Sequence, residues 1–219
     1  MKPDTFVEAL SALQFEDTFN PYSHRCVVHD LEAAPRFRAQ ALRLMLDAAV
    51  ACEVDSLWIG RDLGYRGGRR TGLALTDDIH LDLHAARWGV KIERPTMGRA
   101  VAERTAAVIW DVLARIEVPV FLWNVFPLHP HEAADPFSNR THNARERRAG
   151  EEVLSELIRL LRPRRLIAIG NDAARVAQRL ADDRVVVQVR HPSYGGQTIF
   201  LRQVRELYEL QAERQQSLL

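Results

Sequence analysis

Apolar residues along this chain follow two alternating spacings, which together predict the order of its elements. A spacing of three to four residues is typical of helices that bury one face, and short continuous apolar runs are typical of strands buried on both faces. The helical spacing covers residues 36–52, 98–116, 144–161, 172–181 and 198–215. The strand-length runs cover residues 56–60, 119–125, 165–170 and 185–190.

The fold class follows from this order. Strands separated by helices predict a parallel sheet with right-handed crossovers. We therefore expect an α/β fold, a three-layer α/β/α sandwich around a central four-stranded parallel sheet, with residues 1–219 in a single domain. The segments 62–97 and 126–143 are too irregular for simple connections, and long excursions after strand ends often carry the site in such folds.

The helix predicted over residues 144–161 has sequence signals at both ends. Asn143 precedes it as a capping residue, and Glu146 stands three residues further on, which resembles a capping box. Pro163 cannot continue a helix, because it has no backbone N–H and its ring clashes with the preceding turn. The sequence therefore predicts a helix that ends before Pro163.

Length and composition are those of an ordinary globular protein. The chain has 219 residues, of which 47% are hydrophobic and 27% charged, enough for one domain with a sizeable core. No apolar run reaches the roughly 20 residues that span a bilayer. The N-terminus, with Asp4 and Glu8, lacks the basic start and apolar stretch of a signal peptide. We therefore expect a cytoplasmic protein with no membrane partner and, by default, a monomer.

The two cysteines, Cys26 and Cys52, are too few for a four-thiolate zinc or iron–sulfur site. In a reducing compartment such cysteines are expected to be free thiols. The sequence therefore predicts no metal and no cofactor.

The net charge of +1 indicates no particular partner, but the arginines are unevenly distributed. One group, in a Gly-rich stretch, is Arg66, Arg69 and Arg70, and another is Arg140, Arg145, Arg147 and Arg148. Local basic clusters on a nearly neutral protein fit phosphate contacts on one face. Arginines that simply solvate a surface give the same pattern.

Three polar side chains of different chemistry follow different predicted strands. Asp62 comes after the first strand in GRDLGY, Asn124 ends the second in FLWNV, and His191 follows the fourth in RHPSYGG. The carboxyl ends of parallel strands meet at one edge of a sheet, so these side chains can converge. Each alone is more typical of a turn, a cap or a loop contact, and their joint occurrence is what indicates a site.

These segments resemble the motifs of the uracil-DNA glycosylase superfamily. GRDLGY is similar to the first signature, with Asp62 at the water-activating position, and RTGLALT is similar to the stretch that stacks on an extruded base. FLWNV resembles the strand end with the base-reading Asn, and HPSYGG resembles the second signature with its wedge loop. The NRT segment, the helix after it and LIAIG are similar too, so the resemblance covers residues 57–200.

The resemblance implies a glycosylase-like fold and a DNA repair enzyme. Such an enzyme flips uracil out of DNA and hydrolyses its N-glycosidic bond, leaving an abasic site and free uracil. Asp62 would stabilise the sugar cation and orient the attacking water, and a neutral His191 would donate a hydrogen bond to uracil O2. Asn124 would read the base edge, provided that its neighbours lock the amide.

The resemblance also implies contacts with the base and with DNA. The base-binding positions are Gly60, Arg61, Tyr65, Leu75 and Asn124. The DNA-binding positions are Arg66, Gly67, Gly68, Arg69, Arg70, Ser193 and Tyr194. Tyr65 either excludes thymine or packs at the rim, and Tyr194 is either the wedge in the duplex or an ordinary surface aromatic.

The sequence departs from the family pattern at two positions of the motifs. Leu63 replaces the usual proline, so the loop is less fixed in its backbone conformation. Leu75 replaces the stacking Phe, so the base loses aromatic stacking of about 1–3 kcal/mol. These departures bear on the preference for uracil more than on the glycosylase activity.

Three other functions are compatible with the same residues. One is a glycosylase for another base, such as hypoxanthine, xanthine or a 5-modified uracil. Another is a non-catalytic relative that binds damaged DNA, although binding alone needs neither Asp62 nor His191. The last is a metal-dependent hydrolase using His80, Asp82 and His84, which lack the HExxH pattern and are more typical of a polar helix or loop surface.

Overall fold

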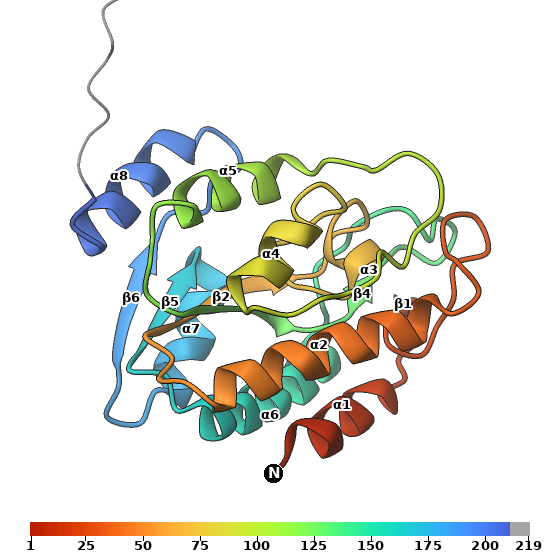
Figure 1. Ribbon diagram of the computed structural model, residues 1–219, viewed down its shortest axis with the longest axis horizontal. Helices are drawn as coiled ribbons and strands as arrows, with labels where there is room; N and C mark the ends of the chain where they lie inside the picture. Colours follow the sequence, from red (N-terminus) through yellow and green to blue (C-terminus); the bar gives the residue numbers. More distant parts are fainter. Residues whose placement is uncertain (211–219) are drawn as a thin grey trace, which may run out of the picture.

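Four parallel strands form the centre of the protein. The structure is a computed structural model that describes residues 1–210. The strands of the central sheet are β2 (Ser56–Asp62), β3 (Val120–Phe126), β5 (Arg165–Ile169) and β6 (Val185–Val189). All are parallel, in the order β3-β2-β5-β6 (Figure 1). The predicted four-stranded parallel sheet is therefore confirmed.

Helices cover both faces of the sheet, as the α/β/α prediction requires (Figure 1). One face is covered by α5 (Arg104–Leu113) and α8 (Gln197–Leu207). The other is covered by α2 (Ala34–Val50), α6 (Ala144–Leu161) and α7 (Asn171–Leu180), and α1 (Pro3–Ser11) packs on α2 and α6.

Alternating side chains of the strands belong to two separate hydrophobic cores. Trp58 and Ile167 share a core with Phe200 of α8. Their neighbours in the chain, Leu57 and Leu166, point the other way and join the core beneath α2 and α6. All five side chains are inaccessible to solvent. Burial on both faces is what the continuous apolar runs predict.

The start of α6 shows the predicted capping box. The Asn143 side chain accepts hydrogen bonds from the backbone N–H groups of Arg145 and Glu146, at 2.9 and 3.0 Å. The Glu146 carboxylate in turn accepts from the Asn143 N–H at 2.7 Å. The helix ends at Leu161, and its C-cap residue Arg162 has a φ of +48°, just before Pro163. Both predicted bounds are confirmed.

The predicted start of α5 is wrong by six residues. The apolar pattern begins at residue 98, but the helix begins at Arg104. Gly98 has a φ of +74°, and the Glu103 N–H donates to the Asp77 carboxylate at 2.5 Å. The segment before α5 is thus held by a hydrogen bond to a distant residue. The spacing of apolar residues contains no information about such a bond.

Five short elements lie outside the predicted set. They are α1, β1 (Thr18–Phe19), α3 (Gly68–Thr71), α4 (Leu81–Arg87) and β4 (His129–Pro130). None is long enough to establish a clear period. β1 pairs antiparallel with β4, and the pair lies with α3 at the right of Figure 1. The predicted helix 198–215 ends at Leu207, and its residues 211–215 fall outside the described chain.

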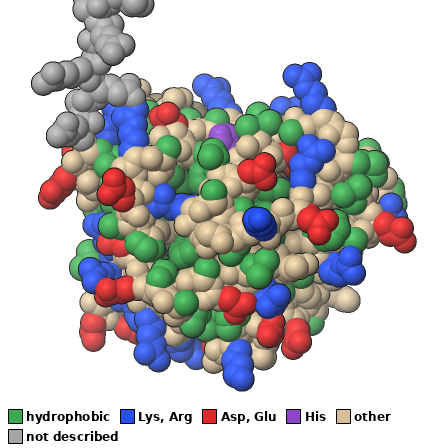
Figure 2. All heavy atoms as spheres, viewed as in Figure 1, with side chains coloured by type: hydrophobic (Ala, Val, Ile, Leu, Met, Phe, Trp, Pro, Cys, Tyr) green, Lys and Arg blue, Asp and Glu red, His purple; other side chains and the backbone are tan. Residues whose placement is uncertain are grey.

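The surface is mixed rather than dominated by one kind of side chain. On the face shown in Figure 2, cationic and anionic side chains are interspersed with apolar ones, and neither sign forms a continuous region. Between residues 1 and 210 no helix combines the length and the apolarity that crossing a bilayer demands. Cys26 and Cys52 are both free thiols, as predicted. A binding surface therefore has to be located from individual side chains.

Candidate active site

The edge of the sheet at its carboxyl end brings Asn124 next to Gly60. These residues are partners in the register between β3 and β2. A Cβ atom at position 60 would collide with the Asn124 Oδ1 and lie 3.2 Å from the Leu75 side chain. The absence of a side chain at Gly60 therefore lets the asparagine amide and Leu75 approach the same point.

The Asn124 amide is buried without a protein partner. The residue is only 1% exposed, and neither its Oδ1 nor its Nδ2 has a hydrogen-bond partner within residues 1–210. Leaving such groups unsatisfied costs about 1–3 kcal/mol, and it needs an explanation in a folded protein. An amide that offers one acceptor and two donors is suited to pairing with the polar edge of a ligand.

Leu75 is held beside this amide by its backbone. It has a φ of +55°, which is uncommon for a residue with a branched side chain. Its carbonyl accepts a hydrogen bond from the Trp110 Nε1 at 3.1 Å. The side chain is half-buried and packs against the core beneath α5 and α8. Leu75 thus provides an apolar surface next to the polar atoms of Asn124.

Asp62 is the last residue of β2, which extends two residues beyond the predicted strand. One carboxylate oxygen, Oδ2, accepts from the Nε of Arg61 at 2.8 Å, and the other, Oδ1, contacts the Nδ1 of His142. The Asp62 side chain is 7% exposed. The carboxylate is thus fixed from two sides at the end of a central strand.

His191 follows β6 and reaches toward the end of β5. A Cβ atom at Gly170 would lie 3.4 Å from the His191 Cβ, in ordinary van der Waals contact, so the two residues are neighbours. The φ of +91° at Gly170 is the feature that favours glycine there. The Ser193 N–H donates to the His191 Nδ1 at 3.1 Å. Because Nδ1 accepts, the neutral ring carries its proton on Nε2.

The environment of His191 favours this neutral ring. Burial lowers the pKa of His191 below its usual value, and the positive charges of Arg61 and Arg190 lower it further. Arg61 also contacts Asp62 and lies 3.9 Å from Asp172. One arginine therefore acts on both the carboxylate and the imidazole that the sequence singles out.

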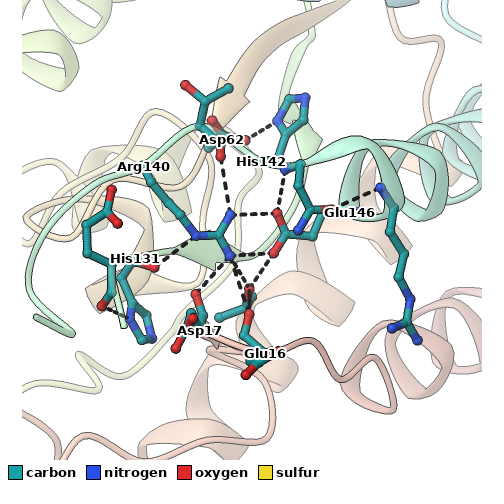
Figure 3. A network of polar contacts seen from close by, with 12 residues as sticks. Glu16, Asp17, Asp62, His131, Arg140, His142 and Glu146 are labelled. Atoms are coloured by element: carbon teal, nitrogen blue, oxygen red, sulfur yellow. Dashed lines mark hydrogen bonds and ion pairs between the residues drawn. The ribbon is translucent and has the colours of Figure 1, made fainter. Parts of the chain in front are cut away.

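An ion pair between the partly buried Arg140 and the buried Glu146 anchors the turn before α6 (Figure 3). The Arg140 guanidinium donates to both oxygens of Glu146, at 2.6 and 2.7 Å, and to the carbonyls of His131 and Asp17. Burial raises the pKa of Glu146, but hydrogen bonds from Arg140, the Asn143 N–H and other donors outweigh it and leave the pKa lowered. Arg140 is thus part of the scaffold rather than a free phosphate ligand.

Two of the predicted phosphate-binding arginines lie inside the protein, which corrects their expected position at the surface. Arg70 pairs with the buried Asp78 at 2.7 Å. The Arg69 guanidinium lies 4.0 Å from the centre of the Phe19 ring. Pairing and stacking make this burial possible. Among the three arginines of this segment, only Arg66 is exposed.

The glycines of the same segment are also buried. The Gly67 N–H donates to the Gly64 carbonyl at 3.2 Å, and Gly68 begins α3. Gly67 is therefore already used within the loop, and the Gly67 and Gly68 amides do not form an open anion cradle in this conformation.

The remaining predicted contacts lie at the rim. The Tyr65 ring packs against Phe137, with ring centres 6.5 Å apart, and its hydroxyl accepts from Arg66. Ser193 Oγ lies 3.3 Å from Thr105 Oγ1. Tyr194 is completely exposed and has a φ of +52°. Of these, Tyr194 is the side chain most free to enter another molecule.

Sequence reasoning missed two titratable residues near the site. His142 contacts Asp62, although the NRTHN segment drew attention only to the residues before it. Glu103 lies beside Gly64 and Gly67, and burial, followed by the charge of Asp77, raises its pKa to about 7. Glu103 fell within a predicted helix, so no motif marked it.

The histidines of the metal-site hypothesis are engaged separately. His80 Nδ1 lies 2.6 Å from Asp77 Oδ1, and His84 Nδ1 lies 2.9 Å from Thr76 Oγ1. His84 is buried rather than at the expected surface, and burial, then Arg87, lowers its pKa to about 3. Within residues 1–210 no group of three or more His, Cys, Asp or Glu side chains is arranged to hold a metal ion.

Comparisons with known proteins identify a family and a similar fold. A family model described as the uracil DNA glycosylase superfamily matches residues 57–207. The structure is similar to the crystal structure of wild-type SMUG2 from Pedobacter heparinus, with a TM-score of 0.59. The two chains are 13% identical over 95% of this chain and 97% of the other, a likeness that concerns the fold. No curated protein sequence matched the chain.

Breaking the Arg140–Glu146 pair should destabilise the protein strongly. We expect Glu146→Ala to lower the free energy of unfolding by about 3–5 kcal/mol, because it leaves a largely buried guanidinium without its partner. Urea denaturation measures this loss. Glu152→Ala removes an exposed carboxylate of the same helix and should change stability by less than about 0.5 kcal/mol. Equal losses in the two variants would contradict the buried pair as an anchor.

Proposed function

The chain belongs to the uracil DNA glycosylase superfamily, and from this premise we propose that it releases uracil from DNA by hydrolysing the N-glycosidic bond. The products are free uracil and an abasic site, as in base excision repair. The observation that carries the proposal is the buried Asn124 amide, whose polar atoms have no partner within residues 1–210. A pyrimidine rotated out of the duplex supplies the missing hydrogen bonds.

Uracil matches the amide in one orientation. Its O4 accepts from Nδ2 of Asn124, and its N3–H donates to Oδ1. Cytosine presents the reversed pair, so its rejection requires that the amide does not flip. Because the amide has no hydrogen-bond partner within residues 1–210, only packing around it can hold this orientation. Gly60 leaves room for the Asn124 amide, and we assign to the neighbouring Leu75 side chain the contact with the face of the base. We assign to Tyr65 the exclusion of larger bases.

Asp62 and His191 stabilise the opposite charges that develop as the bond breaks. As the bond opens, the sugar becomes cationic and the leaving base becomes anionic. We assign the stabilisation of the cation and the orientation of water to the carboxylate of Asp62. The His191 Nε2–H donates to uracil O2 as negative charge develops there. Arg61 orients Asp62 and helps to keep His191 neutral.

Contacts with the duplex come from the loops around this edge. Arg66 and the Ser193 segment are exposed or partly exposed and are assigned to the phosphates. Tyr194, fully exposed and in a strained conformation, is assigned to the space that the flipped base leaves behind. Arg69 and Arg70 support the loop from inside.

Oligonucleotides that carry different bases test the proposed activity. We expect release of uracil from single- or double-stranded DNA in the presence of EDTA, detected by alkaline cleavage at abasic sites. Asp62→Asn and His191→Ala should each reduce the single-turnover rate by about 10²–10³-fold, because each removes a charge or donor at the transition state. Asp182→Asn, a change at an exposed carboxylate, is the control.

Other outcomes of this experiment would indicate other functions. Release of hypoxanthine but not uracil would assign a different lesion, and binding without cleavage would assign a damage sensor. Cleavage that EDTA abolishes would assign a metal-dependent hydrolase.

Asn124→Leu should separate base recognition from folding. We expect kcat/KM for uracil release to fall at least about 100-fold, because both hydrogen bonds to the base are lost. The free energy of unfolding should stay the same or rise, because the amide has no partner to leave behind. Asn20→Leu is the matched control: its buried amide bonds to Leu10 O, Leu13 O and the Tyr22 N–H, so stability should fall. A stability loss at Asn124 as large as that at Asn20 would contradict the assignment.

The acid side of the pH–rate profile should depend on Arg190. Because the pKa of His191 is lowered, the imidazole is protonated, and its contribution lost, at a lower pH than for an ordinary histidine. Arg190→Gln removes one positive charge and should raise this pKa, moving the acid limb to higher pH. Arg202→Gln, at an exposed position of α8, should leave the limb in place. A profile unmoved by Arg190→Gln would count against the electrostatic coupling.

A further inference from the structure

A second imidazole stands at the catalytic edge, and the proposed roles so far leave it unused. His142 Nδ1 contacts the Oδ1 of Asp62, and the two side chains are 6% and 7% exposed. Within residues 1–210 this contact is the only hydrogen bond of the His142 side chain. The ring lies 6.1 Å, centre to centre, from that of Phe126 at the end of β3. It is therefore positioned against the edge of the sheet, at Asp62.

The backbone around His142 is fixed on both sides. Arg140, two residues earlier, is held by Glu146, and Asn143, one residue later, caps α6. Glu146 joins these two anchors, because it also accepts from the Asn143 N–H. Figure 3 shows the His142 ring turned toward Asp62 at the edge of this network, with Arg140 and Glu146 at its centre. The turn that carries His142 is therefore fixed, and it holds the imidazole against the carboxylate of Asp62.

The contact with Asp62 determines which nitrogen of a neutral His142 carries the proton. A carboxylate only accepts hydrogen bonds, so Nδ1 must be the donor. The lone pair then lies on Nε2. This atom has no hydrogen-bond partner within residues 1–210 and is not sealed off from solvent. A water molecule can therefore reach a nitrogen that is ready to accept a proton.

The two imidazoles of the edge consequently have opposite tautomers. In His191 the Nδ1 accepts from the Ser193 N–H, so Nε2 is a donor. In His142 the Nδ1 donates to Asp62, so Nε2 is an acceptor. A donor suits the oxygen of the leaving base, and an acceptor suits the attacking water. The carboxylate of Asp62 accepts hydrogen bonds from Arg61 and His142. It is therefore linked to the proposed acceptor, His142, and through Arg61 to the surroundings of the proposed donor, His191.

We propose that His142 is a catalytic residue, the general base whose Nε2 takes a proton from the water that attacks the sugar. The inference rests on the proposed glycosylase function. The water oxygen bonds to C1′, and the bond between C1′ and the base nitrogen breaks, its electron pair leaving with the base. One water proton passes to Nε2, and the imidazolium returns it to solvent. Asp62 holds the ring in the required tautomer and stabilises both the imidazolium and the sugar cation.

A purely positional role for His142 makes a different prediction. If the imidazole only orients Asp62, any side chain that donates from the same place preserves the activity. The Nδ2 of asparagine stands close to where the Nδ1 of histidine lies, and asparagine has nothing at the place of Nε2. His142→Asn therefore keeps the donor to Asp62 and removes the proposed base.

Single-turnover release of uracil measures this difference. We expect His142→Asn to slow the chemical step by about 10²–10⁴-fold, with little change in the binding of uracil-containing DNA. Added imidazole should restore part of the rate in His142→Ala, because it can occupy the space and accept the proton. His131→Asn is the matched control: its ring bonds to the Glu132 carbonyl, away from Asp62, and the rate should be unchanged.

Three results would overturn the proposal. One is a rate for His142→Asn within about threefold of the unaltered protein, below the range of general-base catalysis. Another is a long-range ¹H–¹⁵N correlation spectrum of the free protein with a proton on Nε2 of His142. The third is a protein–DNA adduct that survives denaturation, since the imidazole itself would then have attacked C1′. An unaltered protein that releases no uracil instead refutes the proposed function, and the water-activation step with it.

Discussion

The parallel register of β2 with β3 and β5 is the constraint on which the site depends. It places Gly60 beside Asn124 and Asp62 beside Phe126, so the functional side chains of two strands end at the same level. The pairing of β5 with β6 then brings the chain to His191 on the far side of Gly170. A slip of one residue in either strand would turn these side chains to the opposite face. The two cores on either side of the sheet oppose such a slip, because alternate strand residues are buried in each.

Arginines that pair with buried carboxylates hold the irregular segments around this edge in shape. Arg140 pairs with Glu146, Arg70 with Asp78, and Arg38 of α2 with Asp30. Removing one partner from such a pair leaves an uncompensated charge, so the loops resist partial opening. The cost of this arrangement is that these arginines do not reach a ligand.

The polar groups of the edge divide into satisfied and unsatisfied ones. Both oxygens of Asp62 have donors, and the His191 Nδ1 has its own. Asn124, by contrast, has no partner within the described chain, and neither does the Nε2 of His142. A site needs polar side chains that the protein holds in place and that keep an atom free to bond with the substrate. This division, more than the identity of any one residue, is the physical basis of the proposed chemistry.

The sequence by itself determined the sheet, the main helices, the superfamily and the three residues at the strand ends. Apolar spacing, capping residues and short motifs are local properties of the sequence. The structure accordingly has Asp62 and Asn124 on the predicted strands and the predicted capping box at the start of α6. Tertiary structure alone decided that α5 starts at Arg104, because its preceding segment is tied to Asp77 by a long-range hydrogen bond. It also buried two arginines that looked like surface charges and placed His142 on Asp62. Such contacts join residues far apart in the chain, and no local pattern records which distant partner a side chain will find.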